Sequence, residues 1–96
     1  MATFAARRLG DMVNNTAVVV GIEAMCAAQG IELKRGLKSS PLVEAEFTKI
    51  RTQVAFLESD RYLAPDLEAM RLWALKADLP AVVTNILPSH AKEPRP

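Results

Sequence analysis

Cys26 and His90 are the one cysteine and the one histidine of this 96-residue chain, and both have side chains that can do chemistry. Cys26 lies in an apolar run, where burial makes a thiol unreactive, so we expect it to be a small buried core residue. His90 lies near the C-terminus, so a Cys–His or Ser–His–Asp arrangement would depend on a chain end. Metal sites need clustered ligands, and we therefore expect neither nucleophilic catalysis nor bound metal.

Glu23 is the single carboxylate within residues 16–28, a stretch in which ten of thirteen residues are apolar. A carboxyl group in apolar surroundings can act as a general acid or base. It can equally form half of a buried ion pair, because burying an unpaired charge costs several kcal/mol. No second catalytic group accompanies Glu23 at helical spacing, so we expect the ion pair.

The arginines allow another enzymatic interpretation, because small all-helical enzymes such as chorismate mutases bind dicarboxylates with arginines from packed helices. The candidates are scattered along the chain: Arg7, Arg8, Arg51 and Arg61. Most have acidic neighbours on the same turn, which favours solvated surface positions. A small arginine-using enzyme remains an alternative.

The segment KRGLKSS, residues 34–40, places three basic residues before two serines at a predicted helix start. A helix N-terminus with nearby cations can attract an anion. The segment lacks the spacing of a phosphate-binding loop, so we expect a solvated connector.

Composition excludes several classes of partner. Twelve basic and eleven acidic residues give a net charge of +1, which does not indicate binding to nucleic acid or to an anionic membrane. One cysteine excludes an internal disulfide and fits a reducing compartment. The apolar stretch is expected to be too short for a signal peptide or for the ~20 residues of a membrane span. We expect a cytoplasmic protein.

Helix-start and helix-stop signals predict an all-α chain with a long N-terminal helix and two or three shorter ones. Gly30 is expected to end the first helix, Ser40 to cap the second and Pro80 to follow the third. The predicted ranges are residues 2–29, 41–56 and 65–77, with one further short turn before Pro88.

The apolar spacing also predicts the core. The second and third helices each have one apolar face, made by Val43, Phe47, Ile50, Val54 and Leu57 and by Leu67, Met70, Trp73 and Ala74. The first helix loses its polar stripe after Thr16. A helix that is apolar all round belongs in a larger core, which makes interface candidates of Val19, Ile22, Glu23, Met25 and Cys26.

The run AARRLGDMVNNTAVVVGIEAMCAAQGIELKRGLKSSPLVEAEFTKIRTQVAFLESDRYLAPDLEAM resembles the C-terminal part of histidine ammonia-lyases and, more loosely, the wider aromatic amino-acid lyase family. Its distinctive pieces are VVGIEAMCAAQGIELKRGLKSS, LESDRYLAPDLE and NILPS, in that order and at family-like spacings. The resemblance extends to about Ser89.

The resemblance implies a part of a much longer helical protein. Family members are tetramers with a central helical bundle, and they eliminate ammonia from an amino acid, giving urocanate in the histidine case. Their electrophile, a methylidene-imidazolone, forms from an internal Ala-Ser-Gly that is absent here, and no catalytic residue of the family maps onto this chain. Residues 1–89 are thus expected to be a C-terminal structural or oligomerisation segment, inactive alone, followed by a flexible tail at 90–96.

The partners implied are the rest of a parent lyase chain or further copies of this one. The segment itself is expected to bind no cofactor. A free-standing helical interaction module remains the second alternative.

Overall fold

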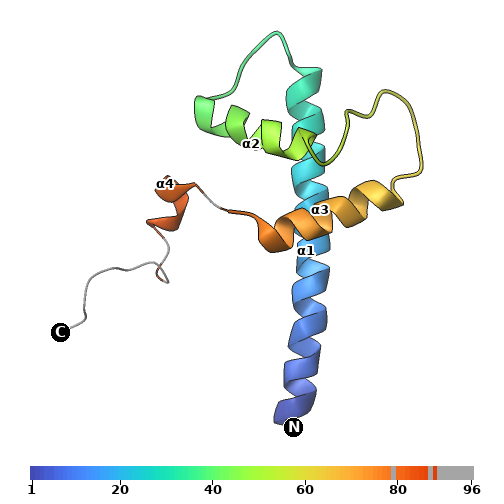
Figure 1. Ribbon diagram of the computed structural model, residues 1–96, viewed down its shortest axis with the longest axis vertical. Helices are drawn as coiled ribbons and strands as arrows, with labels where there is room; N and C mark the ends of the chain where they lie inside the picture. Colours follow the sequence, from blue (N-terminus) through green and yellow to red (C-terminus); the bar gives the residue numbers. More distant parts are fainter. Residues whose placement is uncertain (79, 87, 89–96) are drawn as a thin grey trace, which may run out of the picture.

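The computed structural model describes residues 1–78, 80–86 and 88, and within these residues it contains helices and no strand. The helices are α1 (Ala2–Leu33), α2 (Pro41–Arg51), α3 (Ala64–Lys76) and the short α4 (Ala81–Thr84). α1 forms the long axis, and α2 and α3 cross the part of it that lies nearer its C-terminus (Figure 1). The predicted all-α class is therefore confirmed. The predicted tail at 90–96, with His90, lies outside the described residues.

The end of α1 differs from the prediction. Gly30 does not stop the helix, because it has no positive φ angle and the helix continues to Leu33. The last turn is held from outside: Ile31 packs against the core, and a carboxylate oxygen of Glu32 lies 3.0 Å from Nε of Arg51. These tertiary contacts outweigh the local stop signal of the glycine.

α2 begins as predicted and ends five residues early. The hydroxyl of Ser40 accepts a hydrogen bond from the amide of Val43 at 3.3 Å, and Pro41 opens the helix. The helix stops at Arg51, and the Thr52 hydroxyl then donates to the carbonyl of Lys49 at 2.6 Å. A side chain that bonds its own backbone in this way competes with a further helical turn. α3 matches its predicted range to within one residue.

The core lies where α2 and α3 meet α1. Its buried members are Ala28, Phe47, Ile50, Val54 and Met70, with Ala24, Met25, Ile31 and Trp73 packed around them. Four of the residues predicted from apolar spacing are thus confirmed as core. Val43 was predicted to join them but is 42% exposed, although it shares a face of α2 with Phe47 and Ile50.

α1 and α3 approach each other through small residues on α1. Ala17, Gly21 and Ala28 are the buried residues of this helix, and they share one of its faces. A Cβ atom placed on Gly21 would lie 2.9 Å from both the carbonyl carbon and the carbonyl oxygen of Met70. Because backbone atoms cannot move aside, glycine at this position sets the distance between the two helices.

The loop between α2 and α3 is held at two places. The side-chain amide of Gln29 donates to the carbonyl of Leu57 at 3.0 Å and accepts from its amide at 3.1 Å. Arg61 donates to the carbonyls of Ala55 and Phe56 at 2.9 and 3.1 Å. The segment LESDRYLAP is non-helical up to Leu63, as predicted, and these bonds fix its path across α1.

Candidate interaction surface on the long helix

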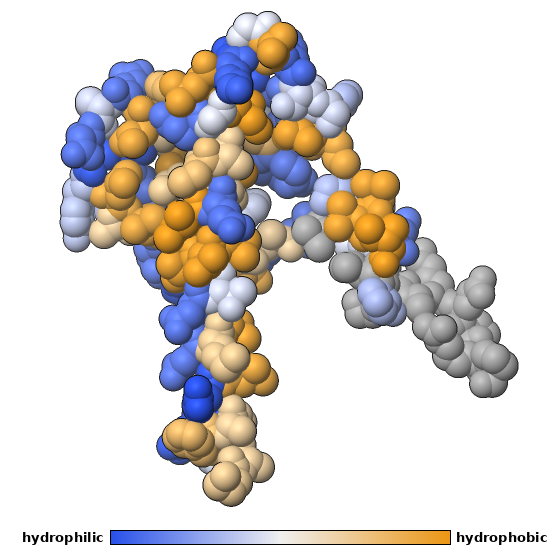
Figure 2. All heavy atoms as spheres, turned by 180° about the vertical axis from the view of Figure 1, so that it is seen from behind, coloured by the Kyte–Doolittle hydropathy of each residue, from blue (hydrophilic) through white to orange (hydrophobic). Residues whose placement is uncertain are grey.

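The N-terminal part of α1 extends beyond α3, and every residue from 1 to 16 is exposed (Figure 1). Figure 2 shows hydrophobic residues gathered along one side of this projecting part and hydrophilic residues along another. The exposed large apolar side chains of α1 are Phe4, Leu9, Met12, Val13, Val19, Val20, Ile22 and Leu33. No described part of the chain covers them.

Many of these side chains form a continuous seam. With 3.6 residues per turn, the face of α1 opposite Ala17, Gly21 and Ala28 carries residues spaced alternately four and three apart. We define the outer seam as Ala5, Leu9, Met12, Thr16, Val19, Glu23 and Cys26, all of which are exposed. Val13 and Val20 widen it on one side. This spacing is the heptad pattern by which one helix packs along another.

The five interface candidates divide between two faces of α1. Val19, Glu23 and Cys26 lie on the outer seam, Ile22 is also exposed, and Met25 is partly buried against the core. The structure thus places most of them where a partner could reach them. Their role in an interface stays a prediction.

Two expectations about these residues are wrong for this chain. Cys26 is exposed and not buried, and Glu23 is exposed and forms no ion pair with any described residue. Glu23 is uncovered because α2 and α3 pack on the opposite face of α1. Cys26 borders a cavity that it shares with residues of the α2–α3 loop, and this loop does not cover it. Apolar neighbours in sequence do not bury a side chain unless another element packs over it.

The arginines do not converge on a free binding site. Arg51 and Arg61 both line a cavity of about 170 Å³ beside Cys26, and protein groups bind most of their donors, although Nη2 of Arg51 is buried without a hydrogen-bond partner among the described residues. Arg51 pairs with Glu32 and donates to the carbonyl of Val54 at 3.2 Å, while Arg61 pairs with Asp66 at 3.0 Å. Arg7 and Arg8 lie far away on the projecting part of α1. The arrangement thus favours a structural role for Arg51 and Arg61.

The anion position at the start of α2 is filled by the chain itself. The Glu44 carboxylate accepts a hydrogen bond from the amide of Ser39 at 3.0 Å and pairs with Arg35 at 3.1 Å. These two donors hold the pKa of Glu44 below its ordinary value. The Arg35 guanidinium also lies 4.3 Å from the centre of the Phe47 ring. An internal carboxylate therefore takes the place that an external anion would need.

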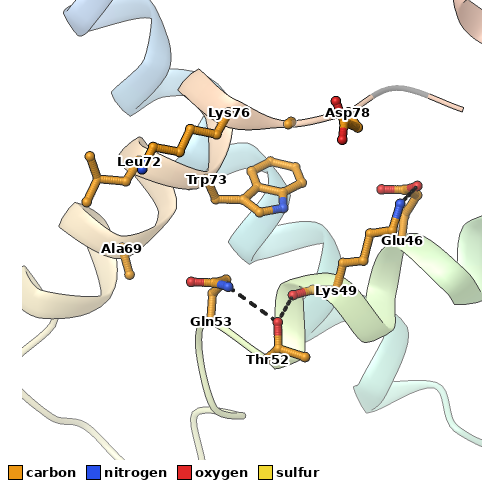
Figure 3. Close-up of a pocket in the computed structure, with 10 residues that line it drawn as sticks. Glu46, Lys49, Thr52, Gln53, Ala69, Leu72, Trp73, Lys76 and Asp78 are labelled. Atoms are coloured by element: carbon orange, nitrogen blue, oxygen red, sulfur yellow. Dashed lines mark hydrogen bonds and ion pairs between the residues drawn. The ribbon is translucent and has the colours of Figure 1, made fainter.

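An open groove of about 600 Å³ lies between α2 and α3 (Figure 3). The Trp73 indole and Lys76 face it from α3, and Lys49 and Gln53 lie on the opposite wall. The Lys49 ammonium is paired with Glu46 at 3.0 Å. This mixture of an aromatic ring and paired charges contains no acid–base pair poised over a common point, and it resembles an interhelical surface more than an active site.

α1 is also the one helix among the described residues that could cross a membrane by length and composition. The apolar stretch was expected to be too short for a membrane span, but by length and composition this helix of 32 residues is sufficient. The core helix of a soluble bundle has the same length and composition. The absence of a membrane partner therefore stays a prediction.

The sequence was compared with protein families, with characterised proteins and with solved structures. Residues 1–52 match the family model described as aromatic amino acid lyase. The histidine ammonia-lyase of Paracidovorax citrulli is 68% identical over 89 residues, which are 93% of this chain and 17% of that protein. The histidine ammonia-lyase of Desulfotalea psychrophila is 48% identical over 93% of this chain and 18% of its own length. No solved structure matches.

Proposed function

The chain belongs to the aromatic amino acid lyase family, and we propose that it is a structural segment of a histidine ammonia-lyase whose long helix joins the oligomer core. The parent reaction would be the elimination of ammonia from L-histidine to give urocanate. The identity of 68% over 93% of the chain supports this parent enzyme. The chain spans 17% of the length of that relative, so most of such an enzyme would lie outside it.

One observation carries the structural role: the outer seam of α1 is apolar and uncovered. Burying one large aliphatic side chain contributes about 1.5–3 kcal/mol, and Leu9, Met12 and Val19 all remain exposed here. Helices from the rest of the parent chain, or from further copies, would recover that free energy. The open groove beside Trp73 would also lie against protein in such an assembly.

The segment would be inactive by itself. The chain contains no Ala-Ser-Gly from which the family's electrophile could form. Its best-placed cations, Arg51 and Arg61, are bound to Glu32 and Asp66. We therefore assign it no catalytic residue and no cofactor, and we propose a cytoplasmic location with no nucleic-acid, membrane or metal partner.

A chimera tests this proposal. The segment of the Paracidovorax citrulli lyase that matches this chain would be replaced by the chain, and urocanate formation from histidine would be followed by absorbance. We expect activity within about tenfold of the unmodified lyase, since both sequences would build the same helical framework. The 96-residue chain alone should give no urocanate. Urocanate production by the isolated chain, or an insoluble and inactive chimera, would contradict the proposal.

A free-standing helical interaction module is the second candidate, and the same uncovered seam favours it. Such a module would form its complexes without lyase sequences, and its insertion into the lyase would not support activity. The chimera therefore separates the two functions.

A further inference from the structure

We propose that the cavity of about 170 Å³ beside Cys26 binds one small, uncharged and largely apolar molecule, whose single carbonyl oxygen accepts a hydrogen bond from Nη2 of Arg51. The cavity lies between α1 and the loop that joins α2 to α3. All of its walls belong to this chain, so the site does not depend on the place of the chain in a lyase.

The walls of the cavity are mainly apolar. Met25 and Cys26 contribute to them from α1, and Val54, Leu57 and Leu63 contribute from the loop. An apolar cavity of about 150 Å³ holds one benzene molecule. The volume of the cavity therefore suits one aromatic ring with a small substituent.

The polar groups on the walls are nearly all paired within the chain. The Gln29 side chain bonds to both backbone groups of Leu57, and Arg61 donates to two carbonyls of the loop and to Asp66. Nη2 of Arg51 is the exception, because it is buried and has no hydrogen-bond partner among the described residues. A buried donor without an acceptor is unfavourable, so a ligand that brings one acceptor is favoured.

The balanced charges around the cavity favour an uncharged ligand. Nε of Arg51 lies 3.0 Å from a carboxylate oxygen of Glu32, and Nε of Arg61 lies 3.0 Å from one of Asp66. A carboxylate from a ligand would have to leave water and would meet guanidinium groups that are already neutralised. A carbonyl oxygen can accept from Nη2 of Arg51 without bringing a charge between apolar walls.

Methionine methyl NMR tests the site in the 96-residue chain, with acetophenone as the probe. Met25 lines the cavity, whereas Met12 is 55% exposed on the projecting part of α1. Acetophenone should shift the Met25 methyl resonance saturably, at about millimolar concentration or below, and leave that of Met12 unchanged. Equal shifts of the two resonances, or a shift that does not saturate, would overturn the site.

Two further probes of similar shape test the chemistry of the ligand. α-Methylstyrene carries a CH₂ group where acetophenone has its oxygen, and it should bind at least about tenfold more weakly because it leaves Nη2 of Arg51 unpaired. Benzoate should also bind at least about tenfold more weakly, because its charge finds no free cation. Equal affinities for acetophenone and α-methylstyrene would reject the hydrogen bond to Nη2. Tighter binding of benzoate would reject the uncharged class.

A bulky side chain in the wall tests the location. Leu63→Trp should fill the cavity and abolish the shift of the Met25 resonance by acetophenone. Leu33→Trp is the matched control, because Leu33 is 69% exposed and is not part of the cavity wall. Circular dichroism should give both variants the helix content of the original chain. Acetophenone binding that survives in Leu63→Trp would overturn the location.

Arg51→Lys tests the donor. Lysine keeps a positive charge beside Glu32 but lacks the planar fork of donors, so the preference for acetophenone over α-methylstyrene should fall to within about twofold. An unchanged preference would reject the role of Arg51. If Arg51→Lys does not fold, the comparison of the two probes in the original chain still decides the role of Nη2.

The single cysteine gives an independent measurement. Cys26 is exposed and borders the cavity, so a bound molecule should hinder alkylation of its thiol by iodoacetamide. Saturating acetophenone should slow this alkylation at least about threefold in the original chain and leave it unchanged in Leu63→Trp. Equal rates with and without acetophenone in the original chain would overturn the site. Both results are independent of the chimera, so the failure of this inference and the failure of the proposed function are distinguishable.

Discussion

The two halves of α1 have very different surroundings, and the more apolar half, residues 17–33, is the one that the other helices cross. Residues 2–16 are all exposed, whereas the later half contains Ala28, which is 1% exposed, and Gly21, which touches the backbone of Met70. A Cβ atom on Gly10 in the first half would meet nothing within 4 Å. One continuous helix thus has a later half that is covered on one face and a first half that is exposed on all sides.

The difference teaches how this chain distributes its side chains. The face of α1 that is covered within the chain carries small residues, and the large side chains of the core come from α2 and α3. Large apolar residues on the projecting part of α1, such as Leu9 and Met12, remain exposed, whereas Met25 and Ile31 pack against the core. The chain therefore builds its own helix crossing with small residues of α1 and leaves larger ones exposed on the projecting part of this helix.

A pair of methionines should give the largest contrast between the halves. Met70 is 0% exposed, so Met70→Ala should lower the free energy of unfolding by about 2–5 kcal/mol through lost packing and a cavity. Met12 is 55% exposed, and Met12→Ala should change it by less than about 0.5 kcal/mol. Urea unfolding followed by circular dichroism, at a concentration with a single sedimenting species, measures both. Equal losses would remove the distinction between covered and bare halves.

A pair of glycines should give effects of opposite sign. Gly21→Ala should destabilise the fold by about 1–3 kcal/mol, because the new methyl group would overlap the Met70 backbone. Gly10→Ala should stabilise it by about 0.5–1 kcal/mol, since alanine is the better helix former and the space is open. The midpoint of thermal unfolding should fall for Gly21→Ala and rise for Gly10→Ala. Stabilisation by Gly21→Ala would mean that the helix crossing is looser than described.

A pair of amides compares the links that each half makes to the rest of the chain. Gln29→Ala removes two partly buried hydrogen bonds to Leu57 and should cost about 1–2 kcal/mol. Asn14→Ala removes two exposed bonds, one that Asn14 donates to the Gly10 carbonyl at 3.3 Å and one that it accepts from Arg71 at 3.1 Å, and should cost less than about 0.5 kcal/mol. Denaturant titration measures the free energy of unfolding of both variants. A larger loss of stability for Asn14→Ala than for Gln29→Ala would contradict the stronger link of the later half of α1 to the rest of the chain.

The smallest expected effect is the pH-dependent contribution of Glu44, in α2, to the stability of the fold. The pKa of Glu44 is lowered from 4.5 in the fold by the Ser39 amide and Arg35. Its contribution to stability is therefore complete above the unfolded value and is lost as the pH falls through the lower, folded value. The stability difference between the original chain and Glu44→Gln should shrink steadily on acidification below pH 4.5. A difference that stays constant would show that this carboxylate is not held by these donors.

The sequence predicted most of the framework because local signals and packing agreed there. The Ser40–Pro41 start of α2 and the apolar spacing through Phe47 and Ile50 were sufficient. Gly30 was misread, because contacts of Ile31 and Glu32 with other elements extend α1. Such tertiary contacts leave no local pattern in the sequence.

The candidate surface was predicted only in part. The excess of apolar residues in α1 indicated a partner, but it could not tell which face this chain covers by itself. The covered face is set by α3 and by its close approach to Gly21, and the sequence does not show this contact. Cys26 and Glu23 were therefore wrongly expected to be buried. The two hydrogen bonds between the Gln29 side chain and the Leu57 backbone were not predicted, because 28 residues separate the two in the sequence.

The hydrogen bonds between Gln29 and Leu57 have a consequence for hydrogen exchange. The Leu57 amide lies in a loop, where amides normally exchange quickly with solvent deuterium, yet it donates to Oε1 of Gln29 at 3.1 Å. It should therefore exchange only when the loop leaves α1. The exchange rate of the Leu57 amide would therefore report how often the loop between α2 and α3 detaches from α1.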